Sequence, residues 1–226
     1  MSTEDAADYA KTKAWLDTLA DQIIRLREHQ RIWEEMQEMV KNNSNLQKPS
    51  VFYDWINDMY VSGMAMAIRR QTDDDSRSVS FVRFLKLVKG NPSLVSRQRY
   101  RALFPKGDAF VEQLEELGMK KDYIDGGYDD LVGPGKQQPT PGDIQVEIDE
   151  LEKVTKKVVA LADKVVAHHD ENKPSDLPTS AEVEAAITYL EKLVQRYKML
   201  FEATHLSMDV AYQYDWKAIF RVPWIR

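Results

Sequence analysis

Apolar residues recur at intervals of three and four along most of this chain, which is the spacing of amphipathic α-helices. The first stripe runs from about Asp5 to Val40, and only Gln30 interrupts it. A second helix is expected after Ser50, a residue that can act as its N-cap. Its expected inner stripe comprises Phe52, Ile56, Met59, Gly63, Met66 and Arg70. The arginine at the end of this stripe is expected to face inward or to lie at the rim of a cleft. Gly63 and Ala67 would let a neighbouring helix approach closely.

Shorter elements follow. Ser78 or Ser80 can start a helix that carries Phe81, Phe84, Leu85 and Val88 and ends at the Gly-Asn-Pro of residues 90–92. A basic helix is then expected from about Ser93 to Phe104. From 122 to 142 the composition changes, because five of the nine glycines lie here together with three prolines and four aspartates. We expect a long loop over this range.

The Thr-Pro-Gly-Asp of residues 140–143 is typical of a helix start, with a cap, a proline at the first position and an acid that can bond back. The stripe of the helix that follows passes Leu161 and Val165, and the next step of three reaches His168. Thr179 is expected to cap a last long helix. The residues 212–226 are rich in aromatic side chains, which predicts that this tail docks on the helices or on a partner.

No alternation of polar and apolar residues persists beyond a few positions, so little or no sheet is expected. The sequence predicts an all-α fold, an irregular up-and-down helical bundle that forms a single domain over residues 1–226. A homodimer is expected.

Composition limits the classes of function. The chain has 226 residues and no cysteine, its N-terminus is acidic, and no window approaches a membrane span. We therefore expect a cytoplasmic protein that does not contact membranes. The net charge is −6, but the stretch from Arg69 to Lys106 has ten basic residues against three aspartates, a net of +7 that leaves −13 for the rest.

This basic stretch is interleaved with aromatic residues, a combination that can hold a phosphate backbone and stack bases. The candidate phosphate-binding residues are Arg69, Arg70, Arg77, Arg83, Arg97, Arg99 and Arg101. The alternative is that these arginines are solvated or pair with the acidic remainder of the chain. The aspartates of residues 122–142 do not meet the EF-hand pattern, so no metal is expected. No cofactor is expected either.

Two stretches resemble a known family. The first is Ala67–Asp73 with Ser76–Leu85, and the second is Asp163–His168 with Asp170, followed by a long helix and Asp215–Trp224. Together they are similar to the abortive-infection branch of the HEPN (higher eukaryote and prokaryote nucleotide-binding) superfamily. The resemblance implies an all-α bundle, usually dimeric, that acts in prokaryotic defence.

In active members, the resemblance implies metal-independent RNA cleavage by an arginine followed, after four to six residues, by a histidine. Histidine can act as acid or base near neutral pH, and guanidinium can hold the phosphate. The resemblance also implies that a polar residue commonly follows the arginine directly. With His168 as the histidine, Ala162 stands in the most natural register for the arginine, and Asp163 then stands at the position of that polar residue. With His169, Lys164 is available at the shortest spacing. Arg69 or Arg70 could instead supply the charge from the second helix.

The candidate catalytic residues are therefore His168, Lys164, Asp163 and His169. The missing arginine favours a protein of the defence or toxin-antitoxin type that interacts with RNA or nucleotide through a degenerate ribonuclease motif. One alternative is an active ribonuclease that uses His168 with Arg69, Arg70 or Lys164. Another is a purely structural bundle that binds a protein partner, in which His168 is an interior histidine and Arg70 forms a salt bridge with Asp73 or Asp163.

Overall fold

The structure, a computed structural model, describes residues 3–105, 116–118, 123–167, 176–208, 212 and 214–222. No strand occurs in these ranges, and the all-α class is confirmed. The α-helices are α1 (Thr3–Lys41), α2 (Val51–Gln71), α3 (Phe81–Gly90), α4 (Arg97–Arg101), α6 (Tyr123–Val132), α7 (Pro141–Leu161) and α8 (Ser180–Glu202). Shorter elements are the 3-10 turns η1 (Pro92–Val95) and η3 (Trp216–Arg221) and the π-helix η2 (Ala162–Ala167). None of the described helices is long and apolar enough to span a membrane.

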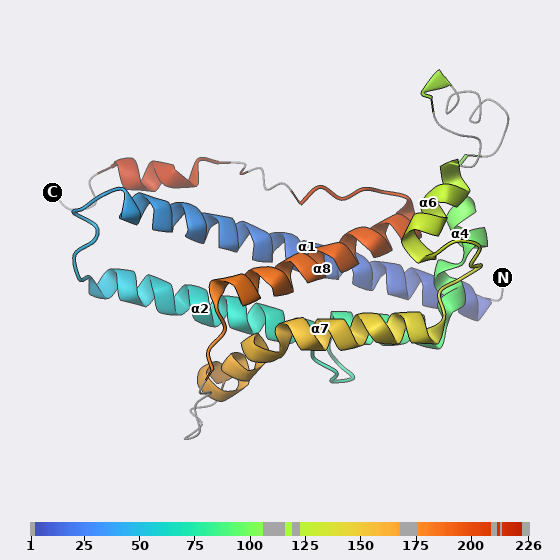
Figure 1. Cartoon of the computed structure of the whole chain (residues 1–226), viewed down its shortest axis with the longest axis horizontal. Coiled ribbons are helices and arrows are strands. Elements are labelled where there is room, and N and C mark those ends of the chain that lie inside the picture. Colours follow the sequence, from blue (N-terminus) through green and yellow to red (C-terminus); the bar gives the residue numbers. More distant parts are fainter. Residues whose placement is uncertain are drawn as a thin grey trace.

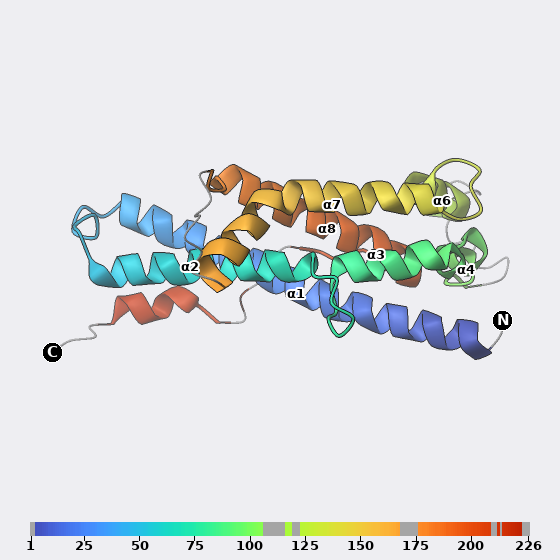
Figure 2. The same ribbon diagram turned by 90° about the horizontal axis from the view of Figure 1, so that it is seen from below.

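The four longest helices lie alongside one another, and α3 continues the line of α2 (Figures 1 and 2). α8 packs on α1 and α7, and α7 packs on α2 and α3. The hairpin of α1 and α2 extends beyond α7 and α8 at one end of the molecule, whereas α4 and α6 lie at the other end (Figure 2). The two ends therefore differ in how many helices surround them.

The core follows the expected stripes along most of the chain. In α1, Leu16, Leu19 and Ile23 are fully buried, and every apolar position expected to be buried in α3 is buried as well. α8 contributes Leu190, Val194, Tyr197 and Phe201. Phe84 of α3 meets Tyr197 edge to face, with ring centroids 4.9 Å apart. The second half of the α1 stripe, which includes Trp33, Met36 and Val40, is only partly buried.

The expected helix starts of α7 and α8 are confirmed. Thr140 accepts a hydrogen bond from the backbone N–H of Asp143, whose carboxylate accepts the N–H of Thr140 at 2.8 Å. Thr179 and Glu182 form the same reciprocal pair at α8. Such capping boxes satisfy backbone donors that the first helical turn leaves unpaired. At α3 it is Ser80, the second of the two candidate residues, that forms the cap.

The expectation of a loop over residues 122–142 is wrong for its first half, because Tyr123–Val132 forms α6. Two glycines in this helix disfavour it locally, but tertiary contacts compensate for that cost. Gly127 lies so close to the Tyr100 hydroxyl that a Cβ would stand 3.2 Å from it. Tyr128, one position further on, is fully buried. Gly127 therefore allows a close approach to Tyr100 and does not mark a loop.

The expected inner face of α2 is also wrong. Its buried residues are Met64, Ala65, Ile68 and Gln71, whereas the expected stripe leaves Phe52, Met59 and Gly63 exposed. α2 carries apolar residues on more than one side, so spacing alone could not select its buried face. The single basic helix expected over 93–104 is likewise divided into η1 and α4.

The aromatic tail docks on the bundle as expected for its described residues. η3 lies beside the second half of α1 (Figures 1 and 2), and Lys217 Nζ reaches Glu35 Oε2 at 2.5 Å. Trp216 and Phe220 pack edge to face with ring centroids 6.0 Å apart. The tail therefore covers one side of the α1–α2 hairpin near its tip.

Candidate functional site

The segment that carries the candidate catalytic residues continues α7 as the π-helix η2. A π-turn has one more residue per hydrogen-bonded ring than an α-turn, and such turns are frequent at functional sites. η2 contacts α2 (Figure 2). This contact brings a segment more than ninety positions away in the sequence to the C-terminal end of α2.

Ala162, the residue in the register of the missing arginine, is fully buried. Asp163 and Lys164 lie towards solvent, and the side chain of Asp163 is 45% exposed. A small residue at position 162 therefore fits the core, whereas a guanidinium there would have to be desolvated. The register of the missing arginine is thus filled by a core residue, and the cation of η2 itself is Lys164, two positions further on.

Arg69 of α2 supplies a cation at this position. Its Nε donates a hydrogen bond to Asp163 Oδ1 at 2.8 Å, between side chains that are 38% and 45% exposed. This hydrogen bond raises the pKa of Arg69 above its ordinary value. Among the described residues, neither Nη1 nor Nη2 of Arg69 has a hydrogen-bond partner.

Arg70 does not take this role. Its side chain is exposed, because the buried face of α2 contains Ile68 and Gln71 and not the expected stripe that ends at Arg70. Asp163 is therefore bonded to Arg69 and not, as one alternative expected, to Arg70. Lys164 is exposed beside Asp163. His168 and His169, together with Asp170, fall outside the ranges that the structure describes.

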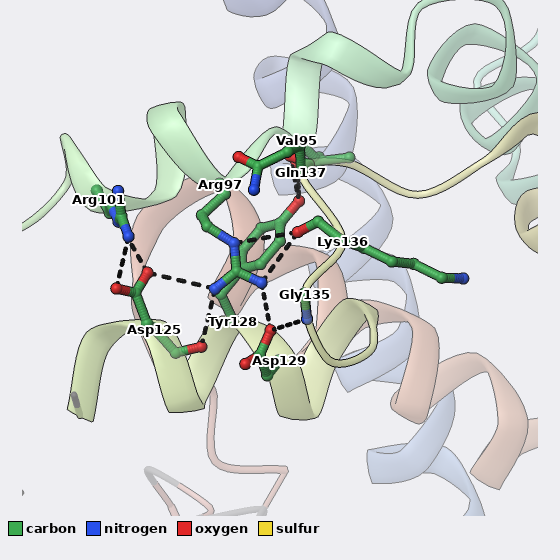
Figure 3. Close-up of polar contacts among 9 residues, drawn as sticks. All are labelled: Val95, Arg97, Arg101, Asp125, Tyr128, Asp129, Gly135, Lys136 and Gln137. Carbon is green, nitrogen blue, oxygen red and sulfur yellow. Dashed lines mark hydrogen bonds and ion pairs between the residues drawn. The ribbon is translucent and has the colours of Figure 1, made fainter.

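Arg97 has a different environment, in the corner between α4 and α6 (Figure 3). Its residue is 5% exposed, and its guanidinium donates to the carboxylates of Asp125 and Asp129 and to the carbonyl oxygen of Lys136. It also lies over the Tyr128 ring, 4.6 Å from the centroid. A phosphate could reach Arg97 only by displacing these partners.

The four other candidate arginines also have partners within the chain. Arg101 pairs with Asp125 at 2.6 Å and Arg77 pairs with Asp75 at 2.9 Å. Arg99 pairs with Asp5 at 3.0 Å and lies over the Tyr9 ring. Arg83 donates to the Ser78 carbonyl and lies over the Trp15 ring. Much of the local positive charge is thereby balanced, and among these arginines Arg77 is the most exposed, at 88%.

Sequence reasoning missed a buried polar cluster between α7 and α8. The Tyr197 hydroxyl donates to Glu147 Oε2 at 2.6 Å, and Arg196 donates to the other carboxylate oxygen. Burial raises the pKa of Glu147. An acid between Ile144 and Ile148 on the apolar stripe was the signal that could have revealed this cluster. Its contacts join α7 to α8 within the core, away from η2.

Comparison with known proteins connects this architecture to a family. The family model HEPN_AbiU2, described as AbiU2, matches residues 9–119, about half of the chain. The chain carries a HEPN domain of the AbiU2 abortive-infection family. The match includes Ala67–Leu85, the first of the two stretches that resemble HEPN proteins, and it contains Arg69. It ends before η2, so the histidine segment lies outside it. No curated protein and no solved structure matches the chain significantly.

Proposed function

We propose that this HEPN protein acts in prokaryotic defence by interacting with RNA or a nucleotide, and that Arg69 replaces the arginine missing from the segment that leads to His168. The observation that carries the proposal is the hydrogen bond between Arg69 and Asp163. It brings a guanidinium from α2 to a segment that has an alanine in the corresponding register. The site is then assembled from two helices and does not require a contiguous motif.

The chemistry of the pair supports an anionic ligand. A guanidinium binds carboxylate and phosphate in the same planar geometry, so a phosphate can share or take over the cation that Asp163 holds. The pair is partly exposed, and an exposed ion pair contributes little to stability. Exchange of one anion for another at Arg69 should therefore cost the fold little. Lys164 adds a second, more mobile positive charge beside it.

Binding of single-stranded RNA by the purified protein tests the proposal. Arg69→Ala should weaken binding by roughly tenfold or more, since a hydrogen bond to a charged group is worth about 1.5–3 kcal/mol. Asp163→Ala should strengthen binding, because the competing carboxylate is gone. Arg77→Ala is the matched control, since Arg77 is also exposed and paired with an aspartate at a similar distance. Equal losses for Arg69→Ala and Arg77→Ala would show that only general charge matters.

A second candidate function, metal-independent RNA cleavage, rests on the same contact. Asp163 precedes His168 by five positions, so Arg69 approaches the segment that carries the titrating group. In such a reaction the histidine would take the proton of the ribose 2′-hydroxyl as its oxygen attacks phosphorus, and Arg69 would stabilise the charge on phosphate. The bond from phosphorus to the 5′-oxygen would break, and that oxygen would leave with a proton from solvent.

Cleavage of RNA in the presence of a metal chelator separates this function from binding alone. Cleavage should be abolished by His168→Ala, should be strongly reduced by Arg69→Ala, and should survive His169→Ala. Cleavage that persists in His168→Ala would reject this histidine as the catalytic group. Absence of cleavage in the wild type, with RNA binding that depends on Arg69, would support the binding function alone.

A further inference from the structure

The tip of the α1–α2 hairpin carries two adjoining hollows. The hairpin extends beyond α7 and α8 at this end, and η3 lies along one side of it (Figures 1 and 2). One hollow, of about 630 Å³, lies between the end of α1 and η3. The other, of about 560 Å³, lies between α1, α2 and the aromatic tail. Met39, Leu46 and Phe220 line both hollows, so the two form one continuous surface.

The hollow between α1 and η3 is acidic. Its charged lining consists of Glu34, Glu35 and Glu38 of α1 and Lys217 of η3. Lys217 pairs with Glu35, and Lys41 lies 3.6 Å from Glu38 between two mostly exposed side chains. Even with Lys41 counted, carboxylates outnumber ammonium groups by three to two among the described residues here. An RNA phosphate is therefore repelled from this hollow, whereas a lysine or arginine side chain is attracted to it.

The second hollow is apolar. Of the described residues that line it, only Lys48 is charged. Met36 of α1 and Phe52 of α2 line opposite sides of it, and Phe52 is 51% exposed. Leu46, where the two hollows meet, is 49% exposed. Adjacent apolar side chains left this exposed indicate an interaction surface, and flexible methionines allow it to fit apolar side chains of different shapes.

The floor of this surface is fixed by contacts within the hairpin. The Tyr53 hydroxyl donates to Gln37 at 2.7 Å, and the Tyr53 ring stacks with that of Trp33, with centroids 6.3 Å apart. In the turn between the helices, the side-chain amide of Gln47 donates to the Lys41 carbonyl at 2.8 Å. A ligand therefore does not have to order α1, α2 or the turn, which lowers the entropic cost of binding.

The docking of η3 shows which chemistry this surface accepts. Lys217 forms an ion pair with Glu35 at 2.5 Å, and Phe220, three positions later, lines both hollows. Residues three positions apart lie on the same side of a 3-10 helix. The cation and the aromatic ring of η3 thus meet the acidic and the apolar parts of the surface together. A segment with the same pairing suits the parts of the two hollows that η3 does not fill.

We propose that the tip of the hairpin binds a basic, amphipathic segment of a partner protein. A lysine or arginine of that segment pairs with Glu34 or Glu38, and a large apolar side chain about one helical turn away enters the second hollow beside Phe52. Phe52 precedes Arg69 by seventeen positions, which is roughly 25 Å along α2 at about 1.5 Å per residue. The partner therefore does not compete with a ligand at Arg69.

Peptide binding by the full chain, measured by fluorescence anisotropy, tests the apolar hollow. The probe is a short labelled peptide with leucines on one face and lysines on the other. Phe52→Asp and Leu46→Asp should each weaken its binding by roughly tenfold or more, because each places a charge where an apolar side chain docks. Their circular dichroism should match the wild type, since both residues are exposed. Val146→Asp is the control, because Val146 of α7 is also exposed but lies off this surface, and it should bind as the wild type does.

Charge reversal tests the acidic hollow. A second peptide, with glutamate in place of each lysine, should bind roughly tenfold or more weakly than the first. Glu34→Lys combined with Glu38→Lys should weaken binding of the lysine peptide by roughly tenfold. Asp149→Lys combined with Glu152→Lys is the control, because it changes the net charge equally on the exposed side of α7. Equal losses for the two double variants would mean that only overall charge attracts the peptide, and the proposal would be overturned.

Other results would also overturn the proposal. One is equal binding of the two peptides, and another is unchanged binding in both Phe52→Asp and Leu46→Asp. A tenfold gain in affinity after removal of residues 223–226 would assign the apolar hollow to the end of the chain itself. A change of oligomeric state in Phe52→Asp, measured by sedimentation equilibrium, would assign it to a second copy. RNA binding by Phe52→Asp should equal that of the wild type, so this surface and the Arg69 site can fail independently.

Discussion

Two arginines of the basic segment, one at each of two helix junctions, show how differently the fold uses the same side chain. At the corner between α4 and α6, Arg97 is almost wholly buried and donates to two carboxylates and to a backbone carbonyl (Figure 3). At the junction between α2 and η2, Arg69 is 38% exposed and donates to Asp163 through Nε. The first arginine joins elements of the fold, whereas the second forms one hydrogen bond and is partly exposed, as the proposed ligand site requires.

The largest effect is expected from Arg97→Ala. This change removes a buried guanidinium that donates to Asp125, Asp129 and the Lys136 carbonyl. Asp125 keeps Arg101 and Asp129 keeps the Gly135 N–H, and the free energy of unfolding should fall by about 2–4 kcal/mol. Denaturant titration followed by circular dichroism measures it. Arg101→Ala is the matched control, because Arg101 bonds the same Asp125 from a side chain that is 57% exposed, and it should cost less than about 1 kcal/mol. Equal costs would remove the distinction between the two kinds of arginine.

Tyr128→Phe should have an intermediate effect at the same corner. The buried hydroxyl donates to the Val95 carbonyl at 2.7 Å, and its loss should cost about 1 kcal/mol. The ring remains beneath the Arg97 guanidinium, so that contact is retained. A loss as large as that of Arg97→Ala would mean that the tyrosine, and not the arginine, holds the corner together.

The carboxylate of Asp143, at the start of α7, should make the stability of the fold depend on pH. The hydrogen bonds from Lys136 and from the backbone N–H of Thr140 lower the pKa of Asp143 to about 2, against about 3.9 in an unfolded chain. A depressed acid stabilises the fold above its unfolded pKa, so this contribution is complete above about pH 4 and is lost as the pH falls towards 2.

Asp143→Asn tests this dependence. At neutral pH, the loss of the capping box and its charge should cost about 1 kcal/mol. The difference from the wild type should shrink as the pH falls from about 4 to 2, measured by thermal unfolding. A difference that does not change over this pH range would assign the effect to the hydrogen bonds of the cap and not to the ionised carboxylate.

The smallest change in stability is expected for Arg69→Ala, by less than about 1 kcal/mol, because an exposed ion pair contributes little. The same denaturant titration measures it. A large loss would place Arg69 in the same structural class as Arg97 and would remove the basis for a ligand at the α2–η2 junction. A small loss combined with weakened RNA binding would sharpen the contrast between the two arginines.

Much of the fold could be predicted from the sequence because its signals are local. The caps at Thr140 and Thr179 depend on residues within one helical turn, and the stripes of α3 and α8 place their apolar residues on one buried face. The family could likewise be recognised from Ala67–Leu85, which lies within the matched range.

The candidate site could be predicted only in part. The missing arginine and the candidate replacements were evident from the sequence. However, the choice of Arg69 over Arg70 depended on the buried side of α2, which apolar residues on more than one side leave undecided. The helix α6 was missed because its glycines disfavour a helix locally, whereas its contacts with Tyr100 and Arg97 come from residues about thirty positions away.

The sequence by itself determined the helical class, the caps of α3, α7 and α8, the core stripes of α3 and α8, and the absence of a contiguous arginine–histidine pair, since each of these depends on neighbouring residues. The tertiary structure decided which arginines are buried and which one meets η2. It also decided which side of α2 stays open. Those outcomes depend on the approach of segments that are distant in the chain, because the burial of each side chain and the charges that surround it are set jointly by several helices.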